Sequence, residues 1–182
     1  MKKPIIAPAM SLNALKACRT DYALNGGAGK QESESFTVIT KGLEGIWQIS
    51  GTSTNIATNG GKAKTIRSKD VTDGLSKTYL AAEKSVPKTD YETGQFWGDE
   101  GSIYTCPAAD CVRFAGHSPI YDPNERLTAC YSCHCFGSAH RATWNAVFCD
   151  GSVHTMSFNI SFATHEALAT RASGDQPNEK EY

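Results

Sequence analysis

A short run of cysteine and histidine residues has the side chains and spacing best suited to chemistry. Cys130-x-x-Cys133-His134 has the spacing that attaches c-type haem, in which two cysteines form thioethers with the porphyrin and the histidine ligates iron. Cys135 follows directly, and the sequence offers no clear helical pocket for a haem. We therefore favour a structural disulfide cluster, predict no bound cofactor, and keep a c-type haem electron carrier as the alternative.

The same region contains side chains that could bind zinc. Seven of them lie within 25 residues: Cys130, Cys133, His134, Cys135, His140, Cys149 and His154. Cys130 and Cys133 would supply half of a tetrahedral site. The other half would come from His140 together with Cys149 or His154, a spacing without a standard template. In an oxidising compartment thiols pair with each other first, so we predict no metal site.

The cysteine pattern favours an oxidising compartment with stapled loops. Six of the seven cysteines lie between residues 106 and 149: Cys106, Cys111, Cys130, Cys133, Cys135 and Cys149. We expect Cys106 to pair with Cys111, and Cys130 to pair within or near the cluster at 130–149. One of Cys133 and Cys135 is expected to reach Cys149 or Cys18. The odd number leaves at least one thiol, with Cys18 and Cys149 as candidates, so we expect three disulfides and one thiol.

His140 also suggests catalysis, with Asp150 as the carboxylate that orients it and a cysteine as the nucleophile. Nothing resembling an oxyanion-hole loop or a nucleophile elbow accompanies this pair. A histidine that enters a hairpin can instead hydrogen-bond to the turn and hold the loop onto the sheet. We therefore predict a structural role for His140, and a chain that is not an enzyme.

The elements that would position these residues are a hairpin and a helix. Residues 144–149 and 153–158 are rich in β-forming residues and flank Asp150-Gly151, a strong short-range signal for a hairpin. Gly151 supplies the positive φ that a tight primed turn needs. After the hairpin, Ser161 is a suitable N-cap for a helix over 162–171, which Gly174 would end.

Alternating or β-rich segments upstream predict further strands at 36–40, 45–50, 66–68 and 78–83, the last preceded by a helical turn at 70–77. Residues 85–129 contain four prolines and little periodicity, which indicates a long surface excursion that is either functional or stapled. The polar tail at 175–182 is expected to fray.

Several stretches of the sequence resemble a known family. His140, nine further residues and Asp150-Gly151 match the H-x9-D-G signature of a large planctomycete family of prepilin-like proteins, domain of unknown function 1559. Residues 136–140, 145–153 and 160–174 extend the match toward the C-terminus. Residues 20–27 (TDYALNGG) are similar to the family's TDY-x-x-N-G-G turn, and 70–84 resembles its D-x-T-D-G-x-S-x-T segment and following strand. The resemblance covers most of the chain in the family's order.

The resemblance implies a pilin-like globular head of the α+β class, built on an antiparallel sheet with a C-terminal hairpin and short helix. Members of the family ordinarily begin with a prepilin cleavage site and a long apolar helix. Residues at the start of this chain show neither, because Pro4 and Pro8 interrupt the short apolar run after Lys3. We interpret the N-terminus as truncated, with the pilin helix absent from this chain.

Composition sets wider limits on function. The 182 residues fit one domain, and 40% hydrophobic with 20% charged residues favours a folded core. A net charge of −1 gives no electrostatic signature for nucleic acid. We predict an extracellular or envelope-anchored pseudopilin or surface filament subunit. It would associate with itself or other pilin-like subunits, and would contact membrane only through the missing helix. An extracellular binding module that uses residues 85–129 is a further alternative.

Overall fold

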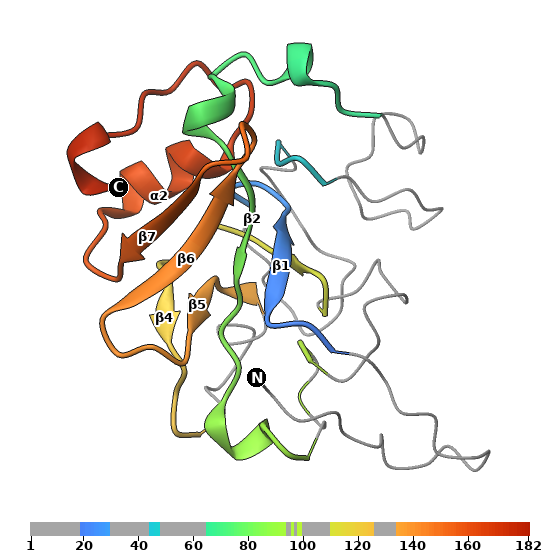
Figure 1. Cartoon of the computed structure of the whole chain (residues 1–182), viewed down its shortest axis with the longest axis vertical. Coiled ribbons are helices and arrows are strands. Elements are labelled where there is room, and N and C mark those ends of the chain that lie inside the picture. Colours follow the sequence, from blue (N-terminus) through green and yellow to red (C-terminus); the bar gives the residue numbers. More distant parts are fainter. Residues whose placement is uncertain are drawn as a thin grey trace.

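The computed structural model describes residues 19–29, 44–47, 65–93, 96, 98–99, 110–125 and 134–182. Their strands form a five-stranded sheet in the order β3-β1-β2-β6-β7 and a two-stranded sheet, β4-β5 (Figure 1). The larger sheet consists of β1 Tyr22–Asn25, β2 Tyr79–Glu83, β3 Val112–Arg113, β6 Thr143–Phe148 and β7 Val153–Ser157. The smaller one consists of β4 Ile120–Tyr121 and β5 Gly137–Ser138.

The larger sheet is mixed, which corrects the prediction of a purely antiparallel sheet. β1-β2, β2-β6 and β6-β7 pair antiparallel, but β3 lies parallel to β1 with Leu24 opposite Val112. β4 and β5 are also parallel. Parallel neighbours need a long connection, and the excursion between β2 and β6 contains β3, β4 and β5. The α+β class is therefore confirmed, and the exclusively antiparallel topology is wrong.

The predicted hairpin is confirmed as β6 and β7, but its turn differs from the prediction. The Gly151 N–H donates to the Phe148 carbonyl (3.0 Å), and the Phe148 N–H donates to the Ser152 carbonyl (2.9 Å). The loop therefore has three residues, 149–151, and its last residue, Gly151, is in the left-handed region at φ +88°. It is not the predicted two-residue primed turn. The glycine still provides the positive φ, but one residue later in the loop than a primed pair would.

The helix α2 (Phe162–Ala169) begins as predicted and ends early. The Ser161 hydroxyl accepts a hydrogen bond from the Thr164 N–H (3.3 Å), which is an N-cap. The helix ends before Thr170, whose backbone is extended, so Gly174 does not terminate it. The reason is tertiary: the Ala169 carbonyl is taken by a side chain from β1, described below.

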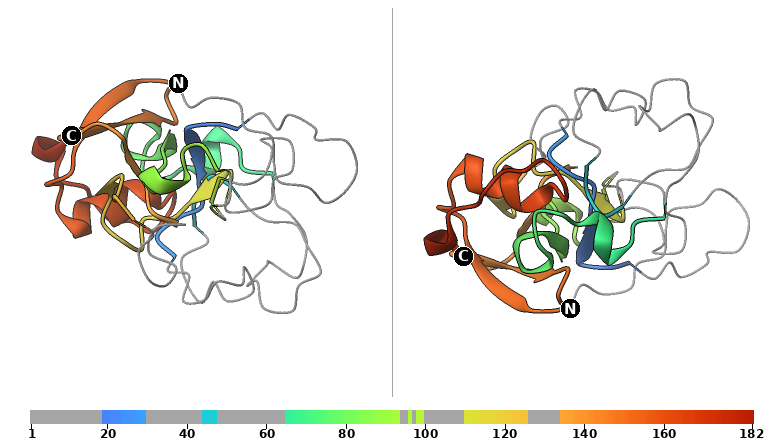
Figure 2. Two further views of the ribbon diagram at one scale, coloured as in Figure 1. Left: turned by 90° about the horizontal axis from the view of Figure 1, so that it is seen from below. Right: turned by 90° about the horizontal axis from the view of Figure 1, so that it is seen from above.

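The core lies between one face of the larger sheet and α2 (Figures 1 and 2). Along β6 the residues Trp144, Ala146 and Phe148 are buried and alternate with half-buried ones, as expected for a strand covered on one face. The Tyr79 ring of β2 meets the Trp144 ring edge-on, with centroids 5.7 Å apart, an arrangement that aromatic pairs prefer. Leu168 of α2 closes this core.

Other predicted elements are replaced by tighter local structure or lie outside the described residues. The strand predicted at 66–68 is absent, and 3-10 helices η1 (Ser68–Asp70) and η2 (Leu75–Lys77) occupy this region. Residues 45–47 form no strand, whereas 36–40 and 48–50 lie outside the described ranges. Two further 3-10 helices are η3 (Lys88–Asp90) and η4 (Glu179–Glu181), and η4 lies in the tail that was expected to fray.

Within the described ranges, none of the helices has the length and apolar character needed to cross a membrane. The predicted lack of a pilin helix concerns residues 1–18, which lie outside those ranges.

Candidate functional site

His140 and Asp150, the two ends of the H-x9-D-G motif, bracket β6 and do not meet. The strand between them has six residues, and a strand rises about 3.3 Å per residue, so roughly 20 Å separates its ends. His140 is exposed, and its Nε2 lies 3.6 Å from Glu83 Oε1. Its backbone N–H donates to Ser138 Oγ (3.0 Å). The motif therefore fixes both ends of a strand, and the pairing of His140 with Asp150 as a catalytic dyad is wrong.

Asp150 holds the hairpin loop. Its Oδ1 accepts hydrogen bonds from the Ser152 N–H (2.8 Å) and the Ser152 hydroxyl (2.7 Å). These bonds lower the pKa of Asp150, because they favour the ionised carboxylate. The Asp150 N–H in turn donates to the Leu75 carbonyl (3.1 Å), which ties the loop to η2.

Asn25, in the TDYALNGG stretch, joins three distant segments. Its side-chain amide is completely buried and donates to the Tyr79 carbonyl of β2 (2.9 Å) and to the Ala169 carbonyl of α2 (2.8 Å). Its Oδ1 accepts from the Gly27 N–H (2.9 Å). The next residue must be glycine, because a Cβ at Gly26 would lie 2.4 Å from the Phe114 ring. The motif therefore joins β1, β2 and α2 through hydrogen bonds to their backbones.

Asp73, in the D-x-T-D-G segment, performs a similar task at the far end of α2. Its carboxylate accepts hydrogen bonds from the backbone N–H groups of Ser173 (2.7 Å) and Gly174 (2.9 Å). Its own N–H donates to the Arg171 carbonyl (3.2 Å), and the Thr78 hydroxyl donates to the Gly74 carbonyl (3.0 Å). The segment before β2 is thereby fastened to the turn after α2.

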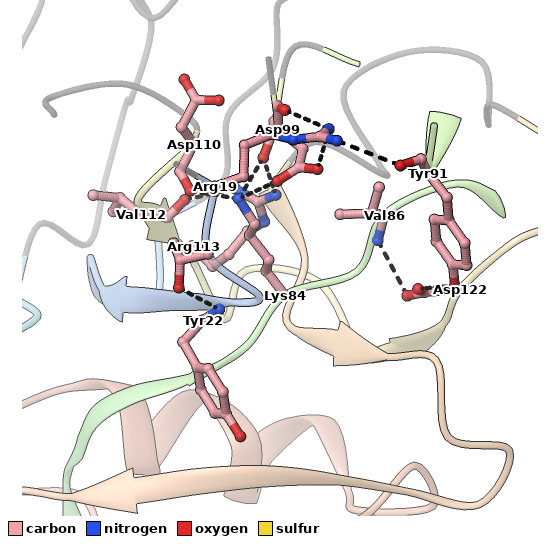
Figure 3. Close-up of polar contacts among 12 residues, drawn as sticks. Arg19, Tyr22, Lys84, Val86, Tyr91, Asp99, Asp110, Val112, Arg113 and Asp122 are labelled. Carbon is pink, nitrogen blue, oxygen red and sulfur yellow. Dashed lines mark hydrogen bonds and ion pairs between the residues drawn. The ribbon is translucent and has the colours of Figure 1, made fainter. Parts of the chain in front are cut away.

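A buried ion cluster, formed by Arg19, Lys84, Asp99 and Arg113, is the most concentrated polar feature among the described residues (Figure 3). Lys84 Nζ lies 2.9 Å from Asp99 Oδ1 and donates to two backbone carbonyls, those of Gly98 (3.0 Å) and Asp110 (2.7 Å).

Two arginines complete the buried ion cluster. Arg19 pairs with Asp99 Oδ2 at 2.8 Å, and Arg113 donates to the Gly98 carbonyl (3.0 Å). Burial and the charge of Arg113 lower the pKa of Lys84 to about 8, against the opposing influence of Asp99. The cluster connects Arg19, which precedes β1, and Lys84, which follows β2, to residues 98–99 and 110–113. These contacts hold the described parts of the excursion against the larger sheet. No local pattern in the sequence predicts this cluster, because even its directly paired members Arg19 and Asp99 lie 80 residues apart.

Comparison with known proteins gives one family. Residues 9–163 match the family described as "Protein of unknown function (DUF1559)". The chain belongs to this family. No curated protein and no solved structure matches it. In this DUF1559 chain, three residues from the stretches that resemble the family, Asn25, Asp73 and Asp150, fasten β1, β2, β6 and α2 to one another.

The cysteines of this DUF1559 chain depart from the predicted pattern. Cys111 is disulfide-bonded. Cys135, which is completely buried, and Cys149 are thiols, so no disulfide joins two described cysteines. Cys149 agrees with its candidacy as a thiol. The prediction that Cys135 and Cys149 are disulfide partners is wrong. The five remaining cysteines (7 − 2) allow at most two disulfides, which corrects the expected three.

The physical reason lies in where the two thiols sit. Cys135 precedes the core residue Phe136, whereas Cys149 lies in the hairpin loop at the far end of β6. Burial, with a smaller contribution from Asp150, raises the pKa of the Cys149 thiol to about 11, so it is a poor nucleophile near neutral pH.

Haem and zinc ligation receive no support from the described residues. His134 is buried, and burial together with Arg113 and His117 lowers its pKa to about 3. The other haem candidates, Cys130 and Cys133, lie outside the described ranges, as does Cys106. Among the residues that the structure describes, no three His, Cys, Asp or Glu side chains are grouped as metal ligands.

Proposed function

We propose that the chain is the globular head of a pilin-like assembly protein, a pseudopilin or surface filament subunit of the cell envelope. The observation that supports this most is the use of the family's motif residues. Asn25, Asp73 and Asp150 all bind backbone groups of other segments. Side chains used in this way build a rigid body, which is what a subunit in an assembly needs.

The geometry around His140 also favours a non-catalytic role. Its imidazole is exposed, its carboxylate neighbour is Glu83, and Asp150 lies beyond the opposite end of β6. The disulfide at Cys111 supports an oxidising location, either extracellular or in the envelope. Its partners would be other copies or other pilin-like subunits, and a helix preceding the head would provide any membrane contact.

Localisation of the native gene product tests this proposal. The gene carries an epitope tag after Tyr182, and the cells are sheared and fractionated, with a tagged cytosolic protein as control. We expect the tag in the envelope and sheared surface fractions, with immunogold labelling along filaments. A tag that remains with the cytosolic control contradicts the proposal. Substrate turnover that His140→Ala abolishes without unfolding the chain would contradict its non-catalytic part.

A further inference from the structure

A hollow of about 500 Å³ lies beside β4, and its size is that of a small-molecule site. Its lining residues are Lys88, Tyr121, Asp122, Pro123, Asn124 and Arg141. We call it the basic hollow. Its walls are fixed by backbone hydrogen bonds: the Lys88 N–H donates to the Pro123 carbonyl (2.9 Å), and the Asp122 N–H donates to the Ser138 carbonyl (2.9 Å).

The two cations of the basic hollow have no acidic partner in the described part of the chain. Lys88 Nζ donates to Asn124 Oδ1 (3.0 Å) and lies 4.2 Å from the centre of the Tyr121 ring. Both contacts are with neutral groups, and the ring attracts the ammonium through its π-face. Arg141 is exposed and forms no ion pair with any described residue. The hollow is therefore lined by two cationic side chains, Lys88 and Arg141, against one acidic side chain, Asp122.

The single acid in the lining is already engaged. Asp122 is 1% exposed, its Oδ1 accepts from the Val86 N–H (3.1 Å), and its Oδ2 accepts from the Tyr91 hydroxyl (Figure 3). Burial, together with that hydrogen bond, raises the pKa of Tyr91, so the phenol remains a donor. Both Asp122 oxygens are thus hydrogen-bonded to donors of the chain, and this holds the carboxylate in the wall of the hollow.

Three side chains that line the basic hollow offer hydrogen-bond donors to a ligand. Lys88 and Arg141 only donate, and Asn124 has its oxygen occupied by Lys88, which leaves its amide hydrogens for a ligand. A ligand must therefore be rich in acceptors and carry negative charge.

We propose that the basic hollow binds the carboxylate of a uronic acid, as a free sugar or as a residue of an acidic polysaccharide. Arg141 receives the carboxylate through its paired N–H groups, Lys88 adds a point charge, and the Asn124 amide donates to a ring hydroxyl. This site is independent of the assembly role, since a chain that forms no filament would still contain it.

Calorimetric titration of the whole chain tests the site, with trigalacturonate and free galacturonate as the probes. We expect both to bind, the neutral galactose trisaccharide not to bind, inorganic phosphate to bind more weakly because it makes no hydroxyl contact with Asn124, and the affinity to fall as salt is raised. Binding of both acids with equal affinity per sugar assigns the site to the free sugar, and tighter binding of the oligomer assigns it to the polysaccharide. Equal binding of the neutral sugar or of phosphate overturns the proposal, as does no binding of either acid.

Variants identify the residues. The double variant Lys88→Gln with Arg141→Gln should lose at least about tenfold in affinity, because two charge-assisted contacts are removed. The matched control is Lys69→Gln with Lys180→Gln, which removes the same charge from two exposed positions elsewhere and should leave the affinity within about twofold. Arg141→Gln alone should fold normally and still weaken binding. Equal losses in the double variant and the control would overturn the site.

Discussion

At the scale of single residues, polar side chains that bind backbone groups carry much of the fold. Asn25 satisfies carbonyls of Tyr79 and Ala169 and an N–H of Gly27 from one buried position. No apolar side chain could replace it, because buried backbone groups left without partners each cost about 1–3 kcal/mol.

Asn25→Ala should therefore lower the free energy of unfolding by at least about 3 kcal/mol, since it leaves three buried backbone groups unpaired. Urea unfolding followed by circular dichroism measures the change. Asn159→Ala, at an exposed position, is the matched control and should stay within about 0.5 kcal/mol of the parent. A loss for Asn25→Ala as small as the control's would show that the three bonds do not stabilise the fold.

The buried ion cluster and a surface ion pair allow a second comparison. Asp99→Asn removes the carboxylate between Lys84 and Arg19 and leaves two buried cations uncompensated, so we expect a loss of about 3–5 kcal/mol. Lys77→Gln breaks the exposed pair with Glu179 (2.7 Å) and should cost far less, because water screens an exposed pair. Similar losses in urea unfolding would mean that Asp99 is solvated and that the cluster is open to water.

At the scale of elements, local signals in the sequence were sufficient for the hairpin and for the start of α2. Asp150-Gly151 between two β-rich runs, and Ser161 before a helical run, depend on residues close in sequence, and the strand at 78–83 is confirmed as β2. The strands that escaped prediction are short and depend on distant partners. β3 has two residues, and it is a strand only because β1, almost 90 positions earlier, lies beside it.

The candidate site divides in the same way. Its family motifs were found in the sequence, but the partners of Asn25 and Asp73 were not, because Tyr79, Ala169 and Ser173 carry no signal of their own. The buried ion cluster was not predicted because its charged residues have the sequence character of surface residues. Lys84 and Asp99 look like surface residues in a polar, proline-containing excursion, and only the folding of that excursion onto β1 buries them.

Gly151→Val tests the hairpin loop. No atom lies within 4 Å of the position that a Cβ would occupy, so the cost comes from the backbone at φ +88° and not from a clash. A β-branched residue in this region should cost about 1–3 kcal/mol. Gly151→Asn, which tolerates the left-handed region better, should cost less. Melting temperatures equal to the parent's in both variants would argue against the loop described here.

At the scale of the whole molecule, two buried histidines set its response to acid. Burial lowers the pKa of His165, and burial with nearby positive charge lowers that of His134, each to about 3. In the unfolded chain a histidine titrates near 6.5. Between these values the unfolded chain binds protons that the folded chain does not, so stability is full above about pH 6.5 and falls as the pH drops toward 3.

The expected slope is about 1.4 kcal/mol per pH unit for each of these histidines between pH 6 and 4. Urea unfolding at successive pH values measures it. His165→Gln should remove one histidine's share of the slope. An unaltered slope in His165→Gln would show that His165 does not remain neutral in the fold.

The cysteine chemistry is also a property of the whole chain. Alkylation of the denatured, non-reduced protein followed by mass spectrometry should label Cys135 and Cys149. We expect no haem increment on Cys130 or Cys133 and no Soret band in the absorption spectrum. A disulfide-linked peptide that contains Cys135 would contradict the structure, and a haem increment would support the electron-carrier alternative.

The three hydrogen bonds of Asn25 also constrain when the protein can fold. One of its partners, the Ala169 carbonyl, lies 144 positions later in the chain. A polypeptide that emerges from a ribosome or a secretion channel N-terminus first therefore has β1 available long before the residue that completes its environment. Until then the Asn25 amide lacks one of its two acceptors, and contacts this distant are the kind that slow folding. Such a chain reaches its native state only after α2 has been released, and it is most vulnerable to proteases in the interval before that.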